Sequence, residues 1–309
     1  MSRFESDTAV NALGGGVFEV DISDGWWVVG APNGGYLAAL VARAVEAAGN
    51  EAAGNEAAGN EAAGNEAAGN ETGASVDHKR IRSITFHFLR APEPGPARVE
   101  CSIERVGRSV ATVTARLVQE GVVQVVALAA LGATRPGPTW NDLTTPTAPD
   151  PAEVATLVGD PEAVAMAEAM GVTIGQRFEL KPCLGSSQAE MSSLAGSGVA
   201  TGASSAAATG GGWLRFEDLA PIDRFGLIAL SDAWAPPMVH KFPDRPPVAP
   251  TVELTVHVRN EPADPHDWVL GHFSSPLAEE GYTVEDAELW DRHGRLLASA
   301  RQVAVIPAL

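Results

Sequence analysis

The sequence predicts an α+β protein made of two similar modules in tandem, each a long helix wrapped by a curved antiparallel β-sheet. Short stretches of the first half recur in the second half in the same order, and each half has one apolar helix pattern and several β-rich segments. The length of 309 residues also suits a two-domain chain. The recurring stretches are 16–20 with 176–180, 85–88 with 255–258, and 117–121 with 289–294. We therefore expect a pseudo-twofold axis, with an interface at which one site can be built from both copies.

The helix of the first module is expected to start at 33–35 (Asn-Gly-Gly) and to continue over 36–45. Apolar residues recur there at helical spacing, which gives the helix one face that can lie on a sheet. The motif EAAGN then occurs five times over 46–70. Its five-residue period matches neither a helix face nor a strand. We expect residues 46–72 to be a mobile insert or a frayed helical extension, with no catalytic role.

Four β-rich segments follow the repeat, and the last two are expected to form a hairpin around Glu120-Gly121. These segments are 81–88, 98–104, 109–119 and 122–131. The second module repeats the plan, with a helix over 221–233 and strands over 251–258, 268–274, 283–290 and 295–306.

These elements predict the domain boundaries. The N-terminal module comprises residues 1–136, residues 137–172 form a crossover linker, and the C-terminal module comprises 173–309. A Gly/Ser/Ala-rich tract over 192–212 is expected to be a loop within the second module. A long helix wrapped by a curved sheet, twice over, is the tandem (double) hotdog architecture.

Composition excludes several classes of protein. The net charge of −18 and the pI near 4.7 argue against nucleic-acid binding, which needs a basic surface. The chain has no apolar stretch long enough for a membrane span, and its first residues lack a signal-peptide pattern. Its two cysteines, Cys101 and Cys183, lie far apart and indicate no disulfide framework. We therefore expect a cytoplasmic protein.

Five stretches carry a family resemblance through their order and spacing. They are GAPNGG at 30–35, TFHFLR at 85–90, GRS at 107–109, LSDA at 230–233 and LLASARQ at 296–302. With them the chain resembles the thioesterase II-like family of acyl-CoA thioesterases, which fuse two hotdogs in one polypeptide. The resemblance covers most of the chain outside the repeat, the crossover and the Gly/Ser/Ala-rich tract. It implies a catalytic set of an Asp on the second helix, a Thr or Ser opening the next long strand, and a Gln in the last strand. Asp232, Thr251 and Gln302 fill these positions.

The chemistry of these three side chains suits thioester hydrolysis, which needs an activated water. Asp232 lies in an otherwise apolar helical run, so partial desolvation would raise its pKa and make it a better base. Gln302 can donate and accept at once, and Thr251 offers a hydroxyl, so both can orient the water. The structural alternatives are a helix cap or ion-pair partner for the Asp, a strand former for the Thr and a solvated edge residue for the Gln.

Other residues are candidates for contact with the substrate. The N–H groups of Gly34 and Gly35 at a helix N-terminus could stabilise the oxyanion, or these glycines could be small only for close packing. His87 could touch the substrate, although its equivalent in the duplication, His257, favours a structural role for both. The basic cluster Arg80, Arg82 and Arg90 could meet the phosphates of coenzyme A, or it could consist of solvated strand-edge charges. Candidate wall residues of an apolar acyl channel are Trp26, Trp27 and Trp234.

Several other chemistries lack their motifs. The sequence has no G-x-S-x-G elbow and no His-Glu-x-x-His, so neither that type of serine hydrolase nor a zinc site is predicted. Gly210-Gly211-Gly212 precedes Trp213 without a preceding strand or a following Lys, and so does not predict a phosphate loop. No cofactor and no metal are expected.

The sequence therefore predicts an enzyme that converts acyl-CoA and water into a free acid and coenzyme A. Two alternatives stay open. One is a hotdog hydratase or dehydratase of enoyl thioesters, which needs a His/Asp pair facing the substrate. The other is a non-catalytic acyl- or lipid-binding protein. A duplicated hotdog already supplies its own pairing, while exposed sheet edges leave a homo-oligomer open.

Overall fold

The computed structural model describes residues 1–62, 78–159, 161–185, 207–242 and 248–306. Within them, twelve antiparallel strands form one sheet in the order β1-β2-β4-β5-β6-β3-β9-β12-β11-β10-β8-β7. The strands of the first half are β1 (Asn11–Gly14), β2 (Val17–Ile22), β3 (Arg80–Phe88), β4 (Gly95–Val106), β5 (Val110–Gln119) and β6 (Val122–Gly132). Those of the second half are β7 (Phe178–Gly185), β8 (Thr209–Phe216), β9 (Thr251–Val258), β10 (Val269–Glu279), β11 (Tyr282–Asp291) and β12 (Leu296–Val305).

The two halves of the sheet have the same strand order, read outward from the centre. β3 pairs with β9 there, and Thr85 lies directly opposite Thr255 with 2.8 Å between the two hydroxyl oxygens. From this pair the order is β3-β6-β5-β4-β2-β1 on one side and β9-β12-β11-β10-β8-β7 on the other. The repeated stretches 85–88 and 255–258 therefore occupy equivalent strands.

One of the predicted repeat pairs is wrong. Residues 16–20 lie mainly in β2, which pairs with β4, whereas residues 176–180 lead into β7, which pairs with β8 at the far edge. The equivalent of β2 is β8, because β8 pairs with β10 as β2 pairs with β4. A short alternating apolar pattern is common to many strands, so such a match does not identify the position of a strand in the sheet.

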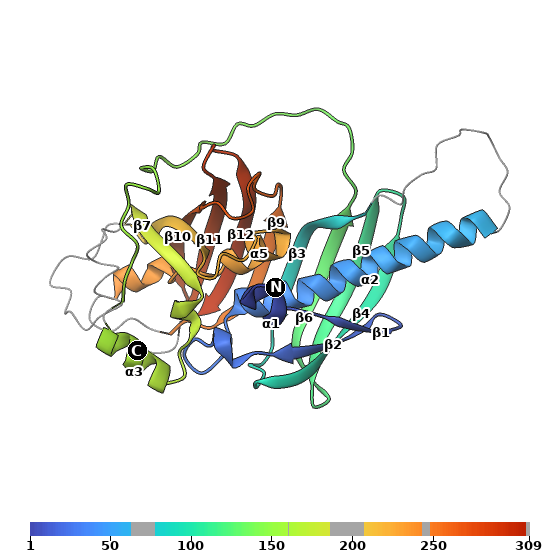
Figure 1. Cartoon of the computed structure of the whole chain (residues 1–309), viewed down its shortest axis with the longest axis horizontal. Helices are drawn as coiled ribbons and strands as arrows, with labels where there is room; N and C mark the ends of the chain where they lie inside the picture. Colours follow the sequence, from blue (N-terminus) through green and yellow to red (C-terminus); the bar gives the residue numbers. More distant parts are fainter. Residues whose placement is uncertain (63–77, 160, 186–206, 243–247, 307–309) are drawn as a thin grey trace.

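Two helices of very different length lie on one face of this sheet (Figure 1). α2 (Gly34–Ala62) crosses the strands of the first half, and α5 (Arg224–Leu230) packs on β9 and β12 of the second half and against α2. Short helices lie at the periphery, α1 (Arg3–Asp7) near the N-terminus and α3 (Pro161–Ala169) in the segment between the halves.

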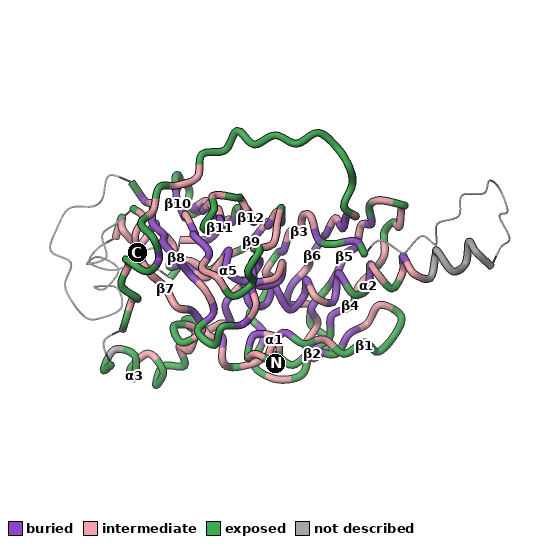
Figure 2. Tube along the Cα trace, turned by 45° about the horizontal axis from the view of Figure 1, so that its top comes forward, coloured by how far each residue is buried: buried purple, intermediate pink, exposed green. Residues whose placement is uncertain are grey.

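Buried side chains from both halves form one continuous core. Figure 2 shows how burial concentrates in the sheet and in α2, while the connection after β6 is exposed. No described helix combines the length and apolar character of a membrane span.

The start of the repeat is a helical extension of α2, which was one of the two expectations, but it packs on the sheet, which was not expected. α2 continues through 46–62 as an unbroken helix, and Glu46, Ala48 and Ala53 are buried. A Cβ on Gly49 would lie 2.8 Å from a methyl carbon of Leu131, so a glycine at this position lets the helix approach the sheet closely. The small residues of the EAAGN motif thus suit this contact. The remainder of the repeat beyond residue 62 lies outside the described residues.

Other predicted boundaries need correction. The second helix ends at Leu230, three residues earlier than expected, and is capped at its N-terminus by Asp223, which accepts from the N–H groups of Phe225 and Gly226. The last four residues of the predicted loop 192–212 belong to β8 instead. Gly211 suits this strand because a Cβ there would overlap the carbonyl oxygen of Gly271 on β10. Its residues 192–206 lie outside the described residues. The predicted crossover contains helix α3, and the sequence patterns did not identify α1, β1, β2 or β7.

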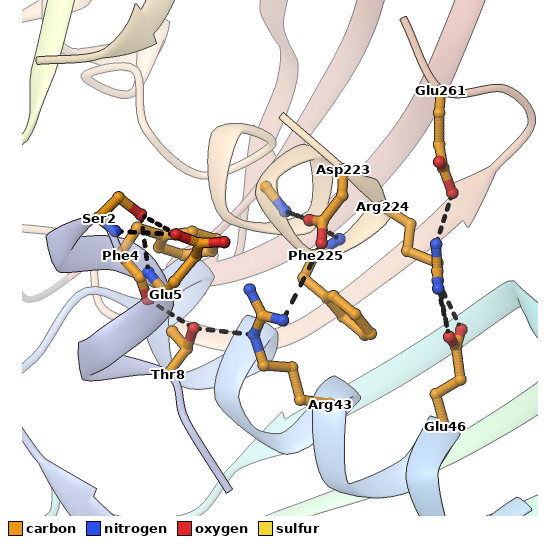
Figure 3. Close-up of polar contacts among 11 residues, drawn as sticks. Ser2, Phe4, Glu5, Thr8, Arg43, Glu46, Asp223, Arg224, Phe225 and Glu261 are labelled. Atoms are coloured by element: carbon orange, nitrogen blue, oxygen red, sulfur yellow. Dashed lines mark hydrogen bonds and ion pairs between the residues drawn. The ribbon is translucent and has the colours of Figure 1, made fainter. Parts of the chain in front are cut away.

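A network of ion pairs connects α2 to the start of α5 (Figure 3). The Arg224 guanidinium binds Glu46 on α2 through Nη2–Oε1 at 2.7 Å, and also Glu261 after β9, through Nη1–Oε1 at 2.7 Å. Oε2 of Glu46 accepts the backbone N–H of Ile81 at 3.0 Å. On the neighbouring turn of α2, Arg43 lies 4.0 Å from Asp223. Glu46 therefore connects three elements from the two halves of the chain.

Replacing Glu46 by Ala is expected to lower the free energy of unfolding by roughly 3 kcal/mol, because it leaves a buried N–H and part of the Arg224 charge without a partner. Denaturant unfolding followed by circular dichroism measures the change. Glu51 is the matched control, since it has the same position in the next unit of the repeat but is exposed. Glu51→Ala should shift stability by no more than about 0.5 kcal/mol. Equal effects of the two substitutions would contradict the packed role of Glu46.

Candidate active site

The three residues of the predicted catalytic set lie together where α5 ends. Asp232 lies in the turn after α5, not on the helix, and Gln302 on β12 donates from Nε2 to its Oδ1 at 3.2 Å. Thr251, the first residue of β9, donates from Oγ1 to Oε1 of Gln302 at 2.7 Å. These contacts form a hydrogen-bonded chain from Thr251 through Gln302 to Asp232. Gln302 itself is buried at 5 % exposure.

The other carboxylate oxygen of Asp232 contacts the N-terminus of α2, in the other half of the molecule. Oδ2 accepts from the N–H of Gly35 at 2.9 Å and from Nδ2 of Asn33 at 3.1 Å. Asn33 also accepts the N–H of Tyr36 at 2.9 Å and so caps the helix. The positive end of the helix dipole therefore lies at the Asp232 carboxylate. The cluster is built from both halves, at the point where α2 meets α5 (Figure 1).

The geometry of Gly34 and Gly35 favours the close-packing alternative. A Cβ on Gly35 would lie 2.5 Å from the carbonyl oxygen of Ala229, and one on Gly34 would lie 2.9 Å from Oδ2 of Asp232. The N–H of Gly35 is already donated to Asp232. It therefore binds the carboxylate rather than facing a site where an oxyanion could form.

The surroundings of Asp232 raise the pKa of its carboxyl to about 6, with burial as the main cause. The hydrogen bonds from Gly35, Gln302 and Asn33 act in the opposite direction, because they stabilise the ionised form. A carboxyl group with this pKa is mostly ionised at neutral pH, yet it is a stronger base than an ordinary Asp. These are the properties that a general base needs.

A fourth polar residue, Glu285 on β11, belongs to this cluster and was not predicted. It lies opposite Gln302 in the β11–β12 pairing, is 4 % exposed, and has its Oε1 3.1 Å from Nε2 of Gln302. Burial and then the nearby charge of Asp232 raise the pKa of Glu285 to about 8. The signal in the sequence is alternation: Ala287 and Leu289 point into the core, so Glu285, two residues earlier, points there too.

The equivalent positions in the first half are apolar. In the second half, Glu285 on β11 pairs with Gln302 on β12. The equivalent pair in the first half is Val113 on β5 with Ala129 on β6. Likewise Ile81 pairs with Leu131 as Thr251 pairs with Ala304. Val113, Ala129 and Ile81 are all buried in the core. The sheet thus carries the polar cluster in its second half and an apolar core in its first half.

The structure separates other predicted residues from this cluster. Alternation along β3 directs Ile84 and Phe86 into the core and His87 to the opposite face, where it is exposed. His257 lies on the corresponding face of β9. Neither strand histidine forms a His/Asp pair with Asp232, as the hydratase alternative would require. Arg90 is exposed in the turn after β3.

The tryptophans pack against other side chains, and the other arginines form polar contacts. Trp234, two residues after Asp232, is buried and stacks on Phe273 with ring centroids 5.7 Å apart. Trp26 is buried against Tyr36 at 5.2 Å, and Trp27 is half-buried. Arg82 donates to the carbonyl of Gly132, and Arg80 lies 3.9 Å from Glu261. Among the described side chains, no group of three or more His, Cys, Asp or Glu residues is arranged to hold a metal ion.

Comparison with known proteins identifies relatives of both halves. Residues 23–132 match the model of the acyl-CoA thioesterase N-terminal domain, and residues 159–306 match that of the C-terminal domain. The uncharacterized protein Rv0499 of Mycobacterium tuberculosis is 26 % identical over 314 residues, which cover 94 % of this chain and 91 % of the relative.

Solved structures show the same fold. A protein assigned as a thioesterase II from Thermobifida fusca superimposes with a TM-score of 0.73 at 24 % identity, covering 100 % of this chain and 98 % of the other. A protein of unknown function with a hotdog fold from Alicyclobacillus acidocaldarius also gives 0.73, at 22 % identity, with 100 % and 99 % covered. The chain therefore has a hotdog-type fold.

The raised pKa of Glu285 predicts a pH-dependent stability. In the folded protein the Glu285 carboxyl group keeps its proton between pH 4.5, the ordinary pKa of Glu, and about pH 8. In the unfolded chain it loses this proton near pH 4.5. The free energy of unfolding should therefore fall as pH rises through this window, by up to roughly 1.4 kcal/mol per pH unit. Glu285→Gln removes this titration, so the variant should gain stability relative to the wild type from pH 5 to 8. Urea unfolding at several pH values tests this, and a difference that does not vary with pH would contradict it.

Proposed function

Because the chain belongs to the acyl-CoA thioesterase family and is a thioester hydrolase, we propose that it hydrolyses acyl-CoA to a free acid and coenzyme A. We further propose that its two halves are a tandem hotdog, with modules at 1–136 and 173–309 joined by the crossover. The single observation that carries the proposed chemistry is the hydrogen-bonded chain from Thr251 through Gln302 to Asp232. It ends on a carboxyl group with a raised pKa at the contact between the two helices.

In the proposed reaction Asp232 takes a proton from water as the water oxygen attacks the thioester carbonyl carbon. The carbon–oxygen bond forms, the tetrahedral intermediate collapses, and the carbon–sulfur bond breaks. The proton held by Asp232 then passes to the departing thiolate. Gln302 fixes the carboxylate through Nε2, and the lone pairs left on Gln302 Oε1 and Thr251 Oγ1 orient the water by accepting from it. The pKa of about 6 keeps Asp232 ionised at neutral pH, as this step requires.

The N-terminus of α2 serves the base rather than the oxyanion in this proposal. The N–H of Gly35 and the helix dipole stabilise the charge of Asp232, which prevents burial from raising its pKa further. Trp234 is a wall residue for the acyl chain, since it is buried two residues from Asp232. Arg90 is a candidate contact for the phosphates of coenzyme A. Arg90 is exposed and follows Phe88 by two residues. The Phe88 ring lies beside the start of α2, where it would be 3.3 Å from a Cβ on Gly34.

Asp232→Asn is expected to lower kcat/KM by about 100- to 1,000-fold, because the amide cannot accept the proton from water. Thiol release from acyl-CoAs of several chain lengths measures the effect. Asp286→Asn is the matched control, since Asp286 lies on the same strand as Glu285 but faces outward and pairs with Arg301. Its activity should stay within about twofold of the wild type. Unchanged turnover in Asp232→Asn would remove this residue from the mechanism.

The pH profile gives a second test of the base. Asp232 acts only when ionised, so wild-type kcat/KM should rise with pH through about 6 and then level off. A steady-state profile from pH 4.5 to 8 measures this limb, and activity that falls across the same range would contradict a carboxylate base.

An enoyl-CoA substrate added to this assay distinguishes the rival functions. Loss of the enoyl absorbance without thiol release would indicate a hydratase, and binding without any turnover would indicate a carrier.

A further inference from the structure

The proposed mechanism leaves one buried ionisable group of the cluster without a role. Glu285 is 4 % exposed, and its carboxyl group lies 3.1 Å from the amide nitrogen of Gln302. A charged or polar side chain in the core lowers stability unless it is paired, and its equivalent in the first half is Val113. An apolar residue therefore fits this sheet position, and the carboxyl group needs another explanation.

The hydrogen bonds of Gln302 supply that explanation. The side-chain amide of a Gln has two N–H donors and one carbonyl acceptor. Turning this amide by half a turn, a flip, exchanges the positions of its nitrogen and oxygen. Here Nε2 lies within hydrogen-bond distance of both Asp232 Oδ1 and Glu285 Oε1, while Oε1 accepts from Thr251. Flipping the amide would direct its oxygen toward two carboxyl groups and its nitrogen toward the hydroxyl of Thr251. Glu285 Oε1 accepts from Nε2 in the observed orientation, so Glu285 favours this orientation when its proton is on the other oxygen, Oε2.

We propose that Glu285 is a positioning residue of the hydrolytic site, which holds the Gln302 amide with its nitrogen toward Asp232 and its oxygen toward Thr251. This inference rests on the proposed function, because it assigns Glu285 a role in the same reaction. Glu285 does not touch the reacting water or the thioester. It acts through Gln302, and so it affects how well Asp232 and the water are aligned.

The protonated form of Glu285 fits this role. A second ionised carboxylate beside Asp232 would repel its charge, whereas a neutral carboxyl group still offers its carbonyl oxygen to Gln302. The pKa of Glu285, raised to about 8 by burial and by Asp232, keeps it neutral at pH 7.

The neighbouring charges agree with a neutral Glu285. The charge of Asp232, in the turn after α5, acts on Glu285 and raises its pKa. Asp286 on the same strand as Glu285 faces the other way and pairs with Arg301. On β10, Ser274 pairs with Asp286 and Leu277 pairs with Val284. The two β10 residues between them, Ser275 and Pro276, are uncharged. The 3-10 helix Pro237–Lys241, which packs on β10, carries His240 and Lys241. None of the groups that shift the pKa of Glu285 is a cation.

Two substitutions separate positioning from a purely structural role. Glu285→Val gives the residue found at the equivalent position of the first half, and it removes the acceptor for Gln302. Glu285→Gln keeps a neutral acceptor oxygen of the same reach. Steady-state thiol release gives kcat and KM for each variant, and thermal unfolding shows that each is folded.

The expected result is a loss of kcat in Glu285→Val of about 10- to 100-fold with KM within about threefold, and a kcat in Glu285→Gln within about threefold of the wild type. Wild-type kcat in Glu285→Val would overturn the proposal. So would a Glu285→Gln variant as impaired as Glu285→Val, because a neutral acceptor would then be insufficient. A purely structural role would instead lower thermal stability in Glu285→Val and leave kcat of the folded fraction unchanged.

Failure of the proposed function gives a different pattern. If the wild type releases no thiol from any acyl-CoA, the proposed hydrolysis is wrong and the role of Glu285 in it falls too. If the wild type is active and Asp232→Asn is not, while both Glu285 variants match the wild type, only the positioning role is overturned.

Discussion

The contact between the start of α2 and the turn after α5 is the constraint on which the rest of the site depends. The N–H of Gly35 meets Asp232 at 2.9 Å. A side chain on Gly35 would meet the backbone carbonyl of Ala229, and one on Gly34 would meet the Asp232 carboxylate. One carboxylate connects the two halves, caps one helix and is activated by burial.

The two halves share one strand order, yet the polar cluster occurs in the second half. The pairing of Thr85 with Thr255 fixes the pseudo-twofold axis, so each position on one side has a defined equivalent on the other. In the first half α2 lies close on Val113 and Leu131, with Gly49 at the contact. In the second half the equivalents of Val113 and Ala129 are Glu285 and Gln302, and the seven-residue α5 ends nearby. The two halves thus differ both in helix length and in side-chain polarity.

The sequence predicts the architecture better than its details. The two helices and the long strands follow from apolar periodicity, and family position identifies Asp232, Thr251 and Gln302, which the structure brings together. Periodicity could not predict that α5 ends before Asp232, since Ser231 and Ala233 continue an acceptable helical pattern. Glu285 was missed because a single Glu in a strand suggests a solvated residue until the inward positions of Ala287 and Leu289 are compared with it. The packing of Glu46 depends on Arg224, 178 residues away, and no local pattern contains that information.

The two halves therefore divide stability and chemistry between them. Asp232 and Glu285 both have raised pKa values, so each binds its proton more tightly in the folded state than in the unfolded chain, and ionising either one lowers stability. A protein can carry such groups only if other contacts offset their cost. The first half supplies those contacts through the apolar interface under α2, and the ion pairs of Glu46 with Arg224 hold the two helices together. Because that interface leaves the same sheet positions apolar, a second site in the first half would remove the packing that stabilises the first site. One polar cluster in two modules is thus the expected outcome of a fold in which each half depends on the other.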